Sequence, residues 1–307
     1  MNNTEDLVLG VDIGGSHITV GLVDMNTHEI VRSSYNREFV NSSGTAEDII
    51  ETWSSLIERI FNVFDIKNKR IGIAMPGPFD YEIGVSYMQD NKKYKNLYGS
   101  NVKQLMAKRL QMPVENIVML NDAACFLKGE VFGGAAVHCN KAIGLTLGTG
   151  LGTAIFNNGL AEDAALWNSP LFEIGIAEDH ISTRWFLKYY YKQTGINVMS
   201  VKELNDIAND SEVARFIFKR FAFNLSEFLP EFIEREKPEM VILGGNITKA
   251  SKRFLPHLRN LLRKKNVHTP ITVSKLGELS SLVGAASCWV TDLSNSTNRE
   301  KAQVSRI

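Results

Sequence analysis

The sequence predicts an α/β fold, because strand-like and helix-like segments alternate along its 307 residues. Apolar, β-branched runs at 7–13 and 17–23 flank a Gly-Gly pair, a pattern typical of a β-hairpin. Segment 49–64 instead repeats apolar residues at helical spacing, as expected of a helix packed on a sheet. A second pair of strand-like runs, 142–147 and 152–156, flanks another glycine-rich turn. The length exceeds that of an ordinary single domain, so two domains or one large α/β unit are expected.

The other elements follow in chain order. In the first half, a third strand at 30–39 could complete a meander, and Thr45 begins a capping box ahead of the helix. A long helix in the second half contains Pro230, which should bend it. The remaining predicted segments are strand 70–75, helix 102–110, strand 117–120, helix 211–235, strand 240–243, helix 249–263, strand 271–274 and helix 282–290.

The predicted domain boundary lies at the junction of the two halves. Residues 1–121 are expected to form one α/β domain, and residues 122–290 a second. The last helix, 282–290, could pack back on the first domain. The polar segment 291–307 is expected to be a frayed tail.

Composition excludes several classes of protein. With 44% hydrophobic and 22% charged residues the chain should fold, and 34 basic residues balance 34 acidic ones. This zero net charge argues against nucleic acid as the main partner. The cysteines, Cys125, Cys139 and Cys288, are widely spaced and odd in number, which favours a reducing compartment over a disulfide framework. Without a leader-like amino terminus or a membrane-spanning apolar stretch, the sequence predicts a cytoplasmic protein with no membrane partner.

The first glycine turn, Gly14-Gly15, suggests a phosphate-binding site. Glycines permit positive φ and leave backbone N–H groups uncovered, which suits a phosphate. A tight hairpin without ligand is the commoner explanation of such a turn taken alone. Asp12 changes the balance, since a carboxylate at the end of an apolar strand is costly to bury unless it meets a cation. Magnesium held through water is the natural partner.

Two further turns have the same character. Gly148-Thr149-Gly150 joins two strand-like runs, and Gly244-Gly245-Asn246 follows the carboxyl end of a strand, where ligands bind in open α/β sheets. Neither a Rossmann fingerprint nor a P-loop fits, because no GxGxxG leads into a helix with a following acidic residue and no Gly-Lys-Ser/Thr occurs.

Three further carboxylates are candidate site residues. Asp122 lies near the junction of the halves and could simply cap the next helix. It could instead be a general base for a hydroxyl that attacks a γ-phosphate, with Asn121 holding a neighbouring hydroxyl. Glu173 and Glu178 flank Gly175 and could bind vicinal hydroxyls, although the residues alone favour solvated loop charges.

Together these segments resemble the ROK family of sugar kinases, a branch of the actin/hexokinase/heat-shock ATPase superfamily. The resemblance covers about residues 7 to 290 and rests on six motifs in order. They are LVLGVDIGGSHITVGLVD, IGIAMPGPFD, YKNLYGS, VMLNDAACFLKGE, IGLTLGTGLGTAIF and VILGGNI. The third motif departs from the family, since Tyr98 and Ser100 replace the usual Pro and Trp.

The resemblance implies a role for each motif. Asp122 becomes the catalytic base. The implied substrate ligands are Gly77, Asn96, Asn121, Asp122, Glu173 and Glu178. The implied ATP-binding residues are Asp12, Gly14, Gly15, Ser16, His17, Gly148, Thr149, Gly150, Gly244, Gly245 and Asn246, with Asp12 also serving Mg²⁺ through water.

One departure concerns the family's zinc loop. The cysteine-rich segment that follows the first sugar-binding glutamate in the family is missing here, so no zinc site is expected. Ile176 stands where the family has a histidine that binds both zinc and sugar. His180 could replace that imidazole, but an ordinary histidine on a helix surface is the favoured interpretation.

The resemblance implies two RNase-H-like (actin-like ATPase) domains with an interdomain cleft. It also implies an ATP-dependent, glucokinase-like phosphorylation of a hexose or hexose derivative at the 6-hydroxyl, with ATP and Mg²⁺ as cofactors, and a homodimer. One alternative is a ROK-type sugar-sensing regulator, although the six residues before the first strand are too few for a winged helix-turn-helix. The other is a non-catalytic sugar-binding protein, against which Asp122 and three nucleotide motifs argue.

Overall fold

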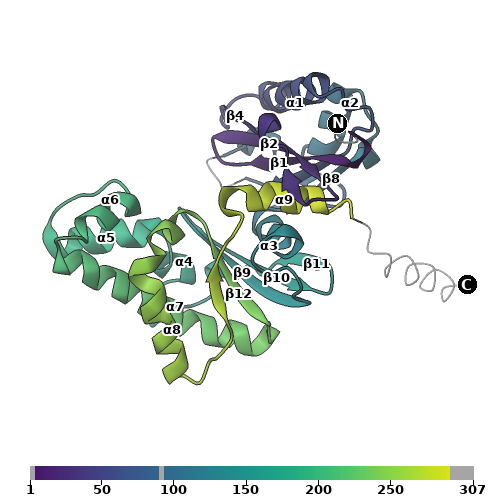
Figure 1. The fold of residues 1–307 in the computed structure, drawn as a ribbon. Coiled ribbons are helices and arrows are strands. Elements are labelled where there is room, and N and C mark those ends of the chain that lie inside the picture. The colour runs from purple at the N-terminus through teal and green to yellow at the C-terminus, as the bar shows by residue number, and fades with distance from the viewer. Residues whose placement is uncertain (1–3, 90–92, 291–307) are drawn as a thin grey trace, which may run out of the picture. The chain divides into compact units, whose positions relative to one another are not determined.

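The computed structural model describes residues 4–89 and 93–290 and divides into two compact units. Of the described residues, 4–89, 93–133 and 281–290 belong to one unit, and 134–280 to the other (Figure 1). The division differs from the boundary expected after residue 121, because helix α3 (Asp122–Gly133) packs within the first unit. Most of helix α9 (Ser280–Ser287) also groups with the first unit. The tail expected at 291–307 lies outside the described residues.

The first unit is built on a sheet with the order β3-β2-β1-β5-β8. Strands β1 (Leu7–Ile13) and β2 (His17–Asp24) form the predicted antiparallel hairpin. Strand β5 (Ile71–Met75) pairs in parallel with β1, and β8 (Ile117–Asn121) pairs in parallel with β5. The carboxyl ends of these three parallel strands therefore lie at one edge of the sheet.

The strand expected at 30–39 is interrupted. It becomes β3 (Glu29–Ile30) and β4 (Asn36–Phe39), separated by a short 3₁₀ helix, and both strands pair with β2. Ser34 explains the break, because its buried hydroxyl accepts a hydrogen bond from Leu22 N at 2.8 Å and donates to Val31 O at 2.6 Å. The local side-chain bonds take the place of ladder bonds here. A small hairpin, β6 (Phe79–Asp80) and β7 (Val85–Ser86), was not predicted.

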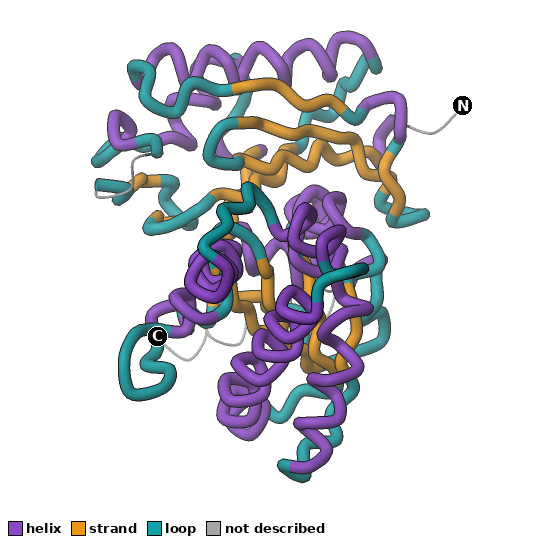
Figure 2. The backbone as a smooth tube through the Cα atoms, turned by 90° about the vertical axis from the view of Figure 1, so that its left-hand side faces the viewer, coloured by secondary structure: helices purple, strands orange, loops and turns teal. Residues whose placement is uncertain are grey.

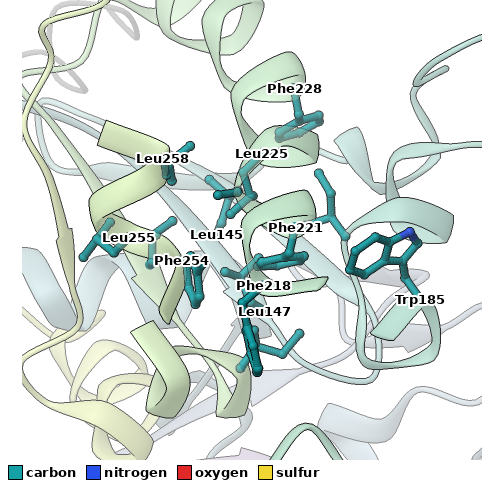
Figure 3. Packing of buried hydrophobic residues seen from close by; sticks show 14 of the residues in the cluster. Leu145, Leu147, Trp185, Phe218, Phe221, Leu225, Phe228, Phe254, Leu255 and Leu258 are labelled. Atoms are coloured by element: carbon teal, nitrogen blue, oxygen red, sulfur yellow. The ribbon is translucent and has the colours of Figure 1, made fainter. Parts of the chain in front are cut away.

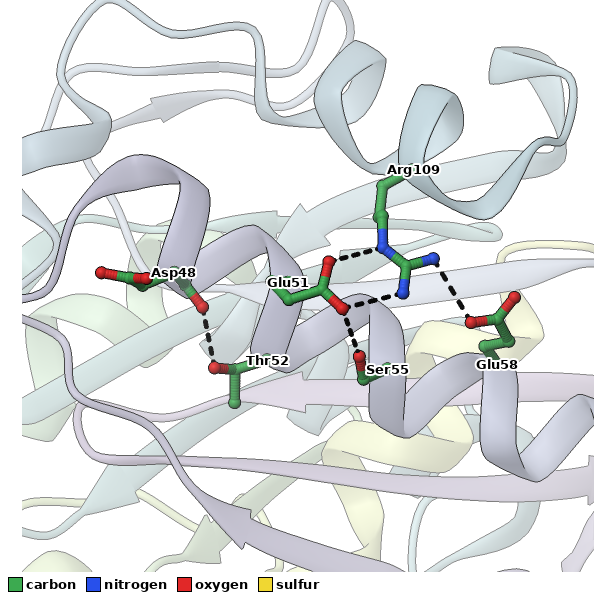
Figure 4. A network of polar contacts seen from close by, with 6 residues as sticks. All are labelled: Asp48, Glu51, Thr52, Ser55, Glu58 and Arg109. Carbon is green, nitrogen blue, oxygen red and sulfur yellow. Dashed lines mark hydrogen bonds and ion pairs between the residues drawn. The ribbon is translucent and has the colours of Figure 1, made fainter.

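Two helices cover this sheet's outer face and are joined by an arginine. Helix α1 (Ala46–Val63) begins with the predicted capping box at Thr45, and α2 (Val102–Leu110) follows. Arg109 on α2 pairs with Glu51 and Glu58 on α1 (Figure 4). Hydrogen bonds from Arg109 lower the pKa of Glu51 to about 2. The exposed network fixes the two helices relative to each other more than it stabilises the fold.

Helix α9 approaches this unit's backbone closely at three glycines. A Cβ on Gly10 of β1 would overlap the carbonyl of Leu282, and one on Gly72 of β5 would overlap the carbonyl of Ala285. A Cβ on Gly284 of α9 would overlap the carbonyl of Cys125 in α3. The absence of these side chains lets α9 and α3 pack backbone to backbone beneath the parallel strands.

The second unit repeats the topology of the first. Its sheet has the order β11-β10-β9-β12-β13, with an antiparallel hairpin followed by two parallel strands. The bounds are β9 (Lys141–Leu147), β10 (Leu151–Asn157), β11 (Leu160–Asp163), β12 (Met240–Gly244) and β13 (Ile271–Val273). The run β2-β1-β5-β8 thus corresponds to β10-β9-β12-β13, and Figure 2 shows helices against the strands of both sheets.

Aromatic and leucine side chains of two long helices form the second unit's core. Helix α7 (Glu212–Glu236) runs through Pro230 without interruption, and α8 (Ser251–Lys264) follows a 3₁₀ turn at Asn246–Ala250. Phe221 of α7 meets Phe254 of α8 edge to face at 5.2 Å, against Leu145 and Leu147 of β9 (Figure 3). Three helices were not predicted: α4 (Ala177–His180), α5 (Thr183–Thr194) and α6 (Val201–Ile207). Within residues 4–89 and 93–290 no helix is both long and apolar enough for a membrane span.

The close packing of α9 gives a stability prediction. Alanine normally favours a helix over glycine by about 1 kcal/mol, but in Gly284→Ala the new methyl group would meet a backbone carbonyl that cannot rotate away. We expect the free energy of unfolding to fall by about 3 kcal/mol, measured by urea denaturation. Ser281→Ala in the same helix is the control and should change it little. Equal stability of the two variants would show that α9 does not pack as described.

Candidate active site

The carboxyl edge of the first sheet gathers the acidic residues that the sequence singled out. Asp12 is opposite Ala74 across the β1–β5 pair, and Asn121 is opposite Met75 across the β5–β8 pair. Asp122 follows directly as the first residue of α3. Parallel pairing therefore brings Asp12, Asn121 and Asp122 to one edge, although more than a hundred residues separate the first from the others.

Asn121, rather than Asp122, caps helix α3. Its Oδ1 accepts hydrogen bonds from Ala123 N at 2.8 Å and Ala124 N at 3.1 Å, and the side chain is buried. Its Nδ2 donates to the hydroxyl of Tyr81 at 3.2 Å, which in turn donates to Met75 O at 3.1 Å. Asn121 thus bonds two backbone N–H groups of the first turn, and one of them, Ala123 N, also lies 2.8 Å from Oδ1 of Asp122. Asn121 mainly orients the start of α3.

Asp122 is exposed at the first turn of that helix. One carboxylate oxygen lies 2.8 Å from Ala123 N. The N-terminus of a helix favours negative charge, so this position stabilises the ionised carboxylate. An exposed, ionised carboxylate on a rigid support can reach a hydroxyl brought to it from solvent.

Asp12 differs from Asp122 in its surroundings. It is only partly accessible, and burial, together with the charge of Asp122, raises its pKa from 3.8 to about 7. Arg37 opposes this increase. Arg37 lies on β4 opposite Thr19, which is itself opposite Asp12 across the hairpin, and sequence reasoning did not identify it. Two carboxylates that repel each other at one sheet edge form a site that a cation would stabilise.

The first glycine turn is closed by its own backbone. Gly14 N donates to His17 O at 2.8 Å, and the hydroxyl of Ser16 lies 2.9 Å from Nδ1 of His17. Neither Gly14 nor Gly15 adopts positive φ, so the conformational reason given for these glycines is wrong. At Gly15 a Cβ would overlap the end of the Lys93 side chain in the position it takes here.

The predicted sugar residues of the first unit have structural contacts as well. Gly77 faces Tyr81, whose hydroxyl would lie 3.2 Å from a Cβ at residue 77. Asn96 uses its Nδ2 to donate to Gly44 O at 2.7 Å and Ser43 O at 3.2 Å. The amide nitrogen of Asn96 therefore holds its loop to residues 43–44. Tyr81 was not identified from the sequence, since only the folded chain brings it to Asn121.

In the second unit, Glu178 is bound to the glycine turn. Its Oε2 accepts a hydrogen bond from Leu151 N at 3.1 Å and lies against Gly150, while Oε1 pairs with Arg184. Thr183 N also donates to Gly148 O at 2.8 Å. Segment 177–184 thus braces the turn at 148–150. Glu178, which the sequence predicts as a sugar ligand, therefore contacts the turn at 148–150, which the sequence predicts as a phosphate-binding turn.

Glu173 and His180 belong to the neighbouring loop. Glu173 is exposed. His180 Nε2 lies 3.0 Å from Ile174 O, and its ring meets Phe172 edge to face at 4.9 Å. The imidazole therefore organises residues 172–176 in this structure. Across the described ranges, 4–89 and 93–290, no cluster of His, Cys, Asp and Glu is arranged to bind a metal ion.

The third glycine turn lies beside the second. Gly245 has a φ of 84°, and a Cβ there would overlap the backbone of Leu147, the residue before Gly148. Both features require glycine. The hydroxyl of Thr248 donates to Gly245 O at 2.7 Å and closes the turn that contains Asn246. The carboxyl ends of β9 and β12 thus bring residues 148–150 and 244–246 together within the second unit.

This fold defines an α/β protein of duplicated topology with a glycine turn in each opening hairpin. A model of the ROK family matches residues 8–162 and 175–292. The chain belongs to the ROK family. The gap between the matched segments contains Glu173, whereas Glu178 lies within the second segment.

Several relatives of the chain are named as sugar kinases. It is 26% identical to the glucokinase of Thermotoga maritima, over 91% of this chain and 96% of that protein. It is 23% identical to the N-acetyl-D-glucosamine kinase of Citrobacter koseri, over 92% of this chain and 99% of that protein. A solved ROK glucokinase from Streptomyces griseus, in complex with glucose and AMPPNP, matches with a TM-score of 0.74 and 23% identity, covering 92% and 98% of the two chains. The likeness confirms the predicted actin-like ATPase fold.

The raised pKa of Asp12 predicts a pH-dependent stability. Between about pH 4 and 7 the folded protein holds a proton on Asp12 that the unfolded chain releases, so raising the pH through this range favours unfolding. Asp12→Asn has no such proton. In buffer without divalent cations, its free energy of unfolding should increase relative to wild type between pH 5 and pH 8. The same difference between the two proteins at both pH values would contradict the assignment.

The brace formed by Glu178 predicts a graded stability series. Glu178→Ala leaves Leu151 N without its acceptor, which should lower the free energy of unfolding by about 1–3 kcal/mol. Glu178→Gln keeps an acceptor and should cost less. Glu173→Ala, on the exposed loop, is the matched control and should stay within about 0.5 kcal/mol of wild type. Urea unfolding of the three variants measures this, and equal effects at 178 and 173 would exclude the brace.

Proposed function

We propose that this ROK-family chain is an ATP-dependent sugar kinase that transfers the γ-phosphoryl group of ATP to a hexose or hexose derivative. By the glucokinase-like resemblance, the acceptor is the 6-hydroxyl. The observation that carries the proposal is the position of Asp122, an exposed carboxylate beside Asp12 and next to a capping asparagine. The sugar-kinase names of the full-length relatives support it.

Asp122 is the proposed general base. It accepts the proton of the sugar hydroxyl as the oxygen attacks the γ-phosphorus, while the ADP leaving group departs in line. Phosphoryl transfer needs little covalent chemistry from the protein, so orientation of this carboxylate is its main contribution. Asn121 and Tyr81 supply that orientation by holding the first turn of α3.

Mg²⁺ is proposed to bind near Asp12 through water. The residues fit, because Asp12 is a desolvated carboxylate whose ionisation is opposed by Asp122, and a divalent cation would favour the ionised form. The metal, when bound, neutralises charge on the transferred phosphate. Asp12 would contribute one acidic group to such a site, and the charge of Arg37 favours its ionised form.

The nucleotide and sugar assignments follow the resemblance to the ROK family. Residues 14–17 and 148–150 are proposed phosphate turns, and residues 244–246 are proposed to hold the adenosine end. For the sugar we retain Gly77, Asn96, Asn121, Glu173 and Glu178, with Glu178 and Asn96 also holding backbone. The homodimer remains a prediction from the resemblance, and the cytoplasmic location remains a prediction from the sequence composition.

A second candidate is a sugar-binding or sugar-sensing protein without turnover. The missing zinc loop and Ile176 in place of the family histidine favour it. Such a protein would bind sugar without releasing ADP. A coupled ADP-release assay over hexoses, N-acetylhexosamines and fructose distinguishes the two, because a kinase releases one ADP for each sugar phosphate formed, whereas sugar binding without ADP release supports the second candidate.

The role of Asp122 gives the catalytic prediction. With the best sugar of that panel, Asp122→Asn should lower kcat by about 10²–10⁴ while leaving sugar affinity within about tenfold. Asp210→Asn, which changes an exposed aspartate outside the predicted site, is the control and should keep wild-type turnover. Turnover of Asp122→Asn within threefold of wild type would remove this residue from the role of base.

A further inference from the structure

Lys93 lies directly on the first glycine turn. Its Nζ, Cε and Cδ all occupy positions that would overlap a Cβ on residue 15, so the side chain takes this position across the turn beside a glycine. None of the sequence motifs includes Lys93 among the nucleotide residues, and it reaches the turn from a loop almost eighty residues away in the chain. Its exposed ammonium group is thus delivered to the turn by the fold.

The next residue explains why Lys93 stays there. Tyr94 is fully buried, meets Trp53 edge to face at 5.2 Å and donates from its hydroxyl to Gly14 O at 2.6 Å. Its backbone N donates to Ser42 O at 2.8 Å. Its φ of 56° lies in the left-handed region, which is unfavourable for a tyrosine, and the surrounding contacts maintain it. Tyr94 therefore anchors the backbone beside Lys93 to the turn itself.

The charged groups at this edge indicate a role for the ammonium group of Lys93. Asp12 and Asp122 interact there, and Arg37 is the cation that acts on Asp12. A nucleotide phosphate arriving at the turn would bring more negative charge to the same edge. Lysine binds phosphates as a flexible point charge, and an exposed side chain can move with the group it binds.

We propose that Lys93 binds a phosphate group of the nucleotide at the Gly14–Gly15 turn. The proposal rests on the assignment of this turn to ATP phosphates in the proposed function. Gly15 then has two roles. It leaves backbone N–H groups uncovered for a phosphate, and it leaves space for the lysine side chain across the turn. Tyr94 is a positioning residue for this contact.

The test compares a ligand that has phosphates with one that lacks them. Calorimetric titration of Lys93→Ala with AMPPNP and Mg²⁺ should show a five- to thirtyfold weaker affinity than wild type, while adenosine affinity stays unchanged. Lys93→Arg should restore AMPPNP affinity to within about threefold. Lys95→Ala, an exposed lysine of the same loop, is the matched control and should bind AMPPNP as wild type does.

The outcomes separate this proposal from the function on which it rests. Wild-type AMPPNP affinity in Lys93→Ala would overturn the proposal, and so would an equal loss of adenosine affinity, which would indicate a structural role. If wild type binds no AMPPNP, the kinase assignment fails, and pyrophosphate becomes the probe. Pyrophosphate binding that is weakened in Lys93→Ala but not in Lys95→Ala would still support the lysine site, whereas equal binding or none would overturn it.

Discussion

The electrostatic conflict between Asp12 and Asp122 is the constraint on which the site depends. Burial and, to a smaller extent, the charge of Asp122 raise the pKa of Asp12 to about 7, against the opposing charge of Arg37. A fold gains nothing in stability from two such carboxylates at one sheet edge, so their placement indicates function. Arg37, the N-terminus of α3 and, in our proposal, Lys93 and a magnesium ion all act on this conflict. The residues of the first unit that matter most are therefore those that hold or neutralise the pair.

Backbone packing, rather than side-chain contacts, keeps that edge in place. Gly10, Gly72 and Gly284 let α9 lie against β1, β5 and α3 at distances that no side chain would allow. Because β1 and α3 carry Asp12 and Asp122, the distance between the carboxylates is set by elements that can hardly shift. The second unit uses the same device at Gly245, which brings the third glycine turn against Leu147. Rigid support of this kind suits a reaction whose catalysis is mostly orientation.

Much of the fold and of the candidate site could be predicted from the sequence, and the predictions that were wrong or missing have physical reasons. The hairpins, the parallel strands and helices α1, α2 and α7 follow from apolar periodicity and capping, which are local signals. The prediction of one continuous strand at 30–39 was wrong because the hydroxyl of Ser34 accepts a hydrogen bond from Leu22 N. No local sequence pattern reveals this contact. Helices α4 and α6 span only four and seven residues, too short for a periodic pattern to stand out, and α5 was missed although its sequence is amphipathic. Asn121 and Asp122 were found as motif residues, but their division into a cap and an exposed carboxylate needed the structure. Arg37, Tyr81 and Lys93 reach the site from distant segments, so only tertiary packing brings them there.

The charge state of Asp12 is the most direct measure of this account. Carbon-13 NMR of the side-chain carboxyl group, assigned by its absence in Asp12→Asn, reports the pKa without reference to stability or turnover. In metal-free protein we expect titration near pH 7, the value that burial and Asp122 impose. In Asp122→Asn the pKa should fall but stay above 3.8, because burial is the larger cause. Titration of Asp12 near pH 4 in the wild-type protein, unchanged in Asp122→Asn, would contradict the account.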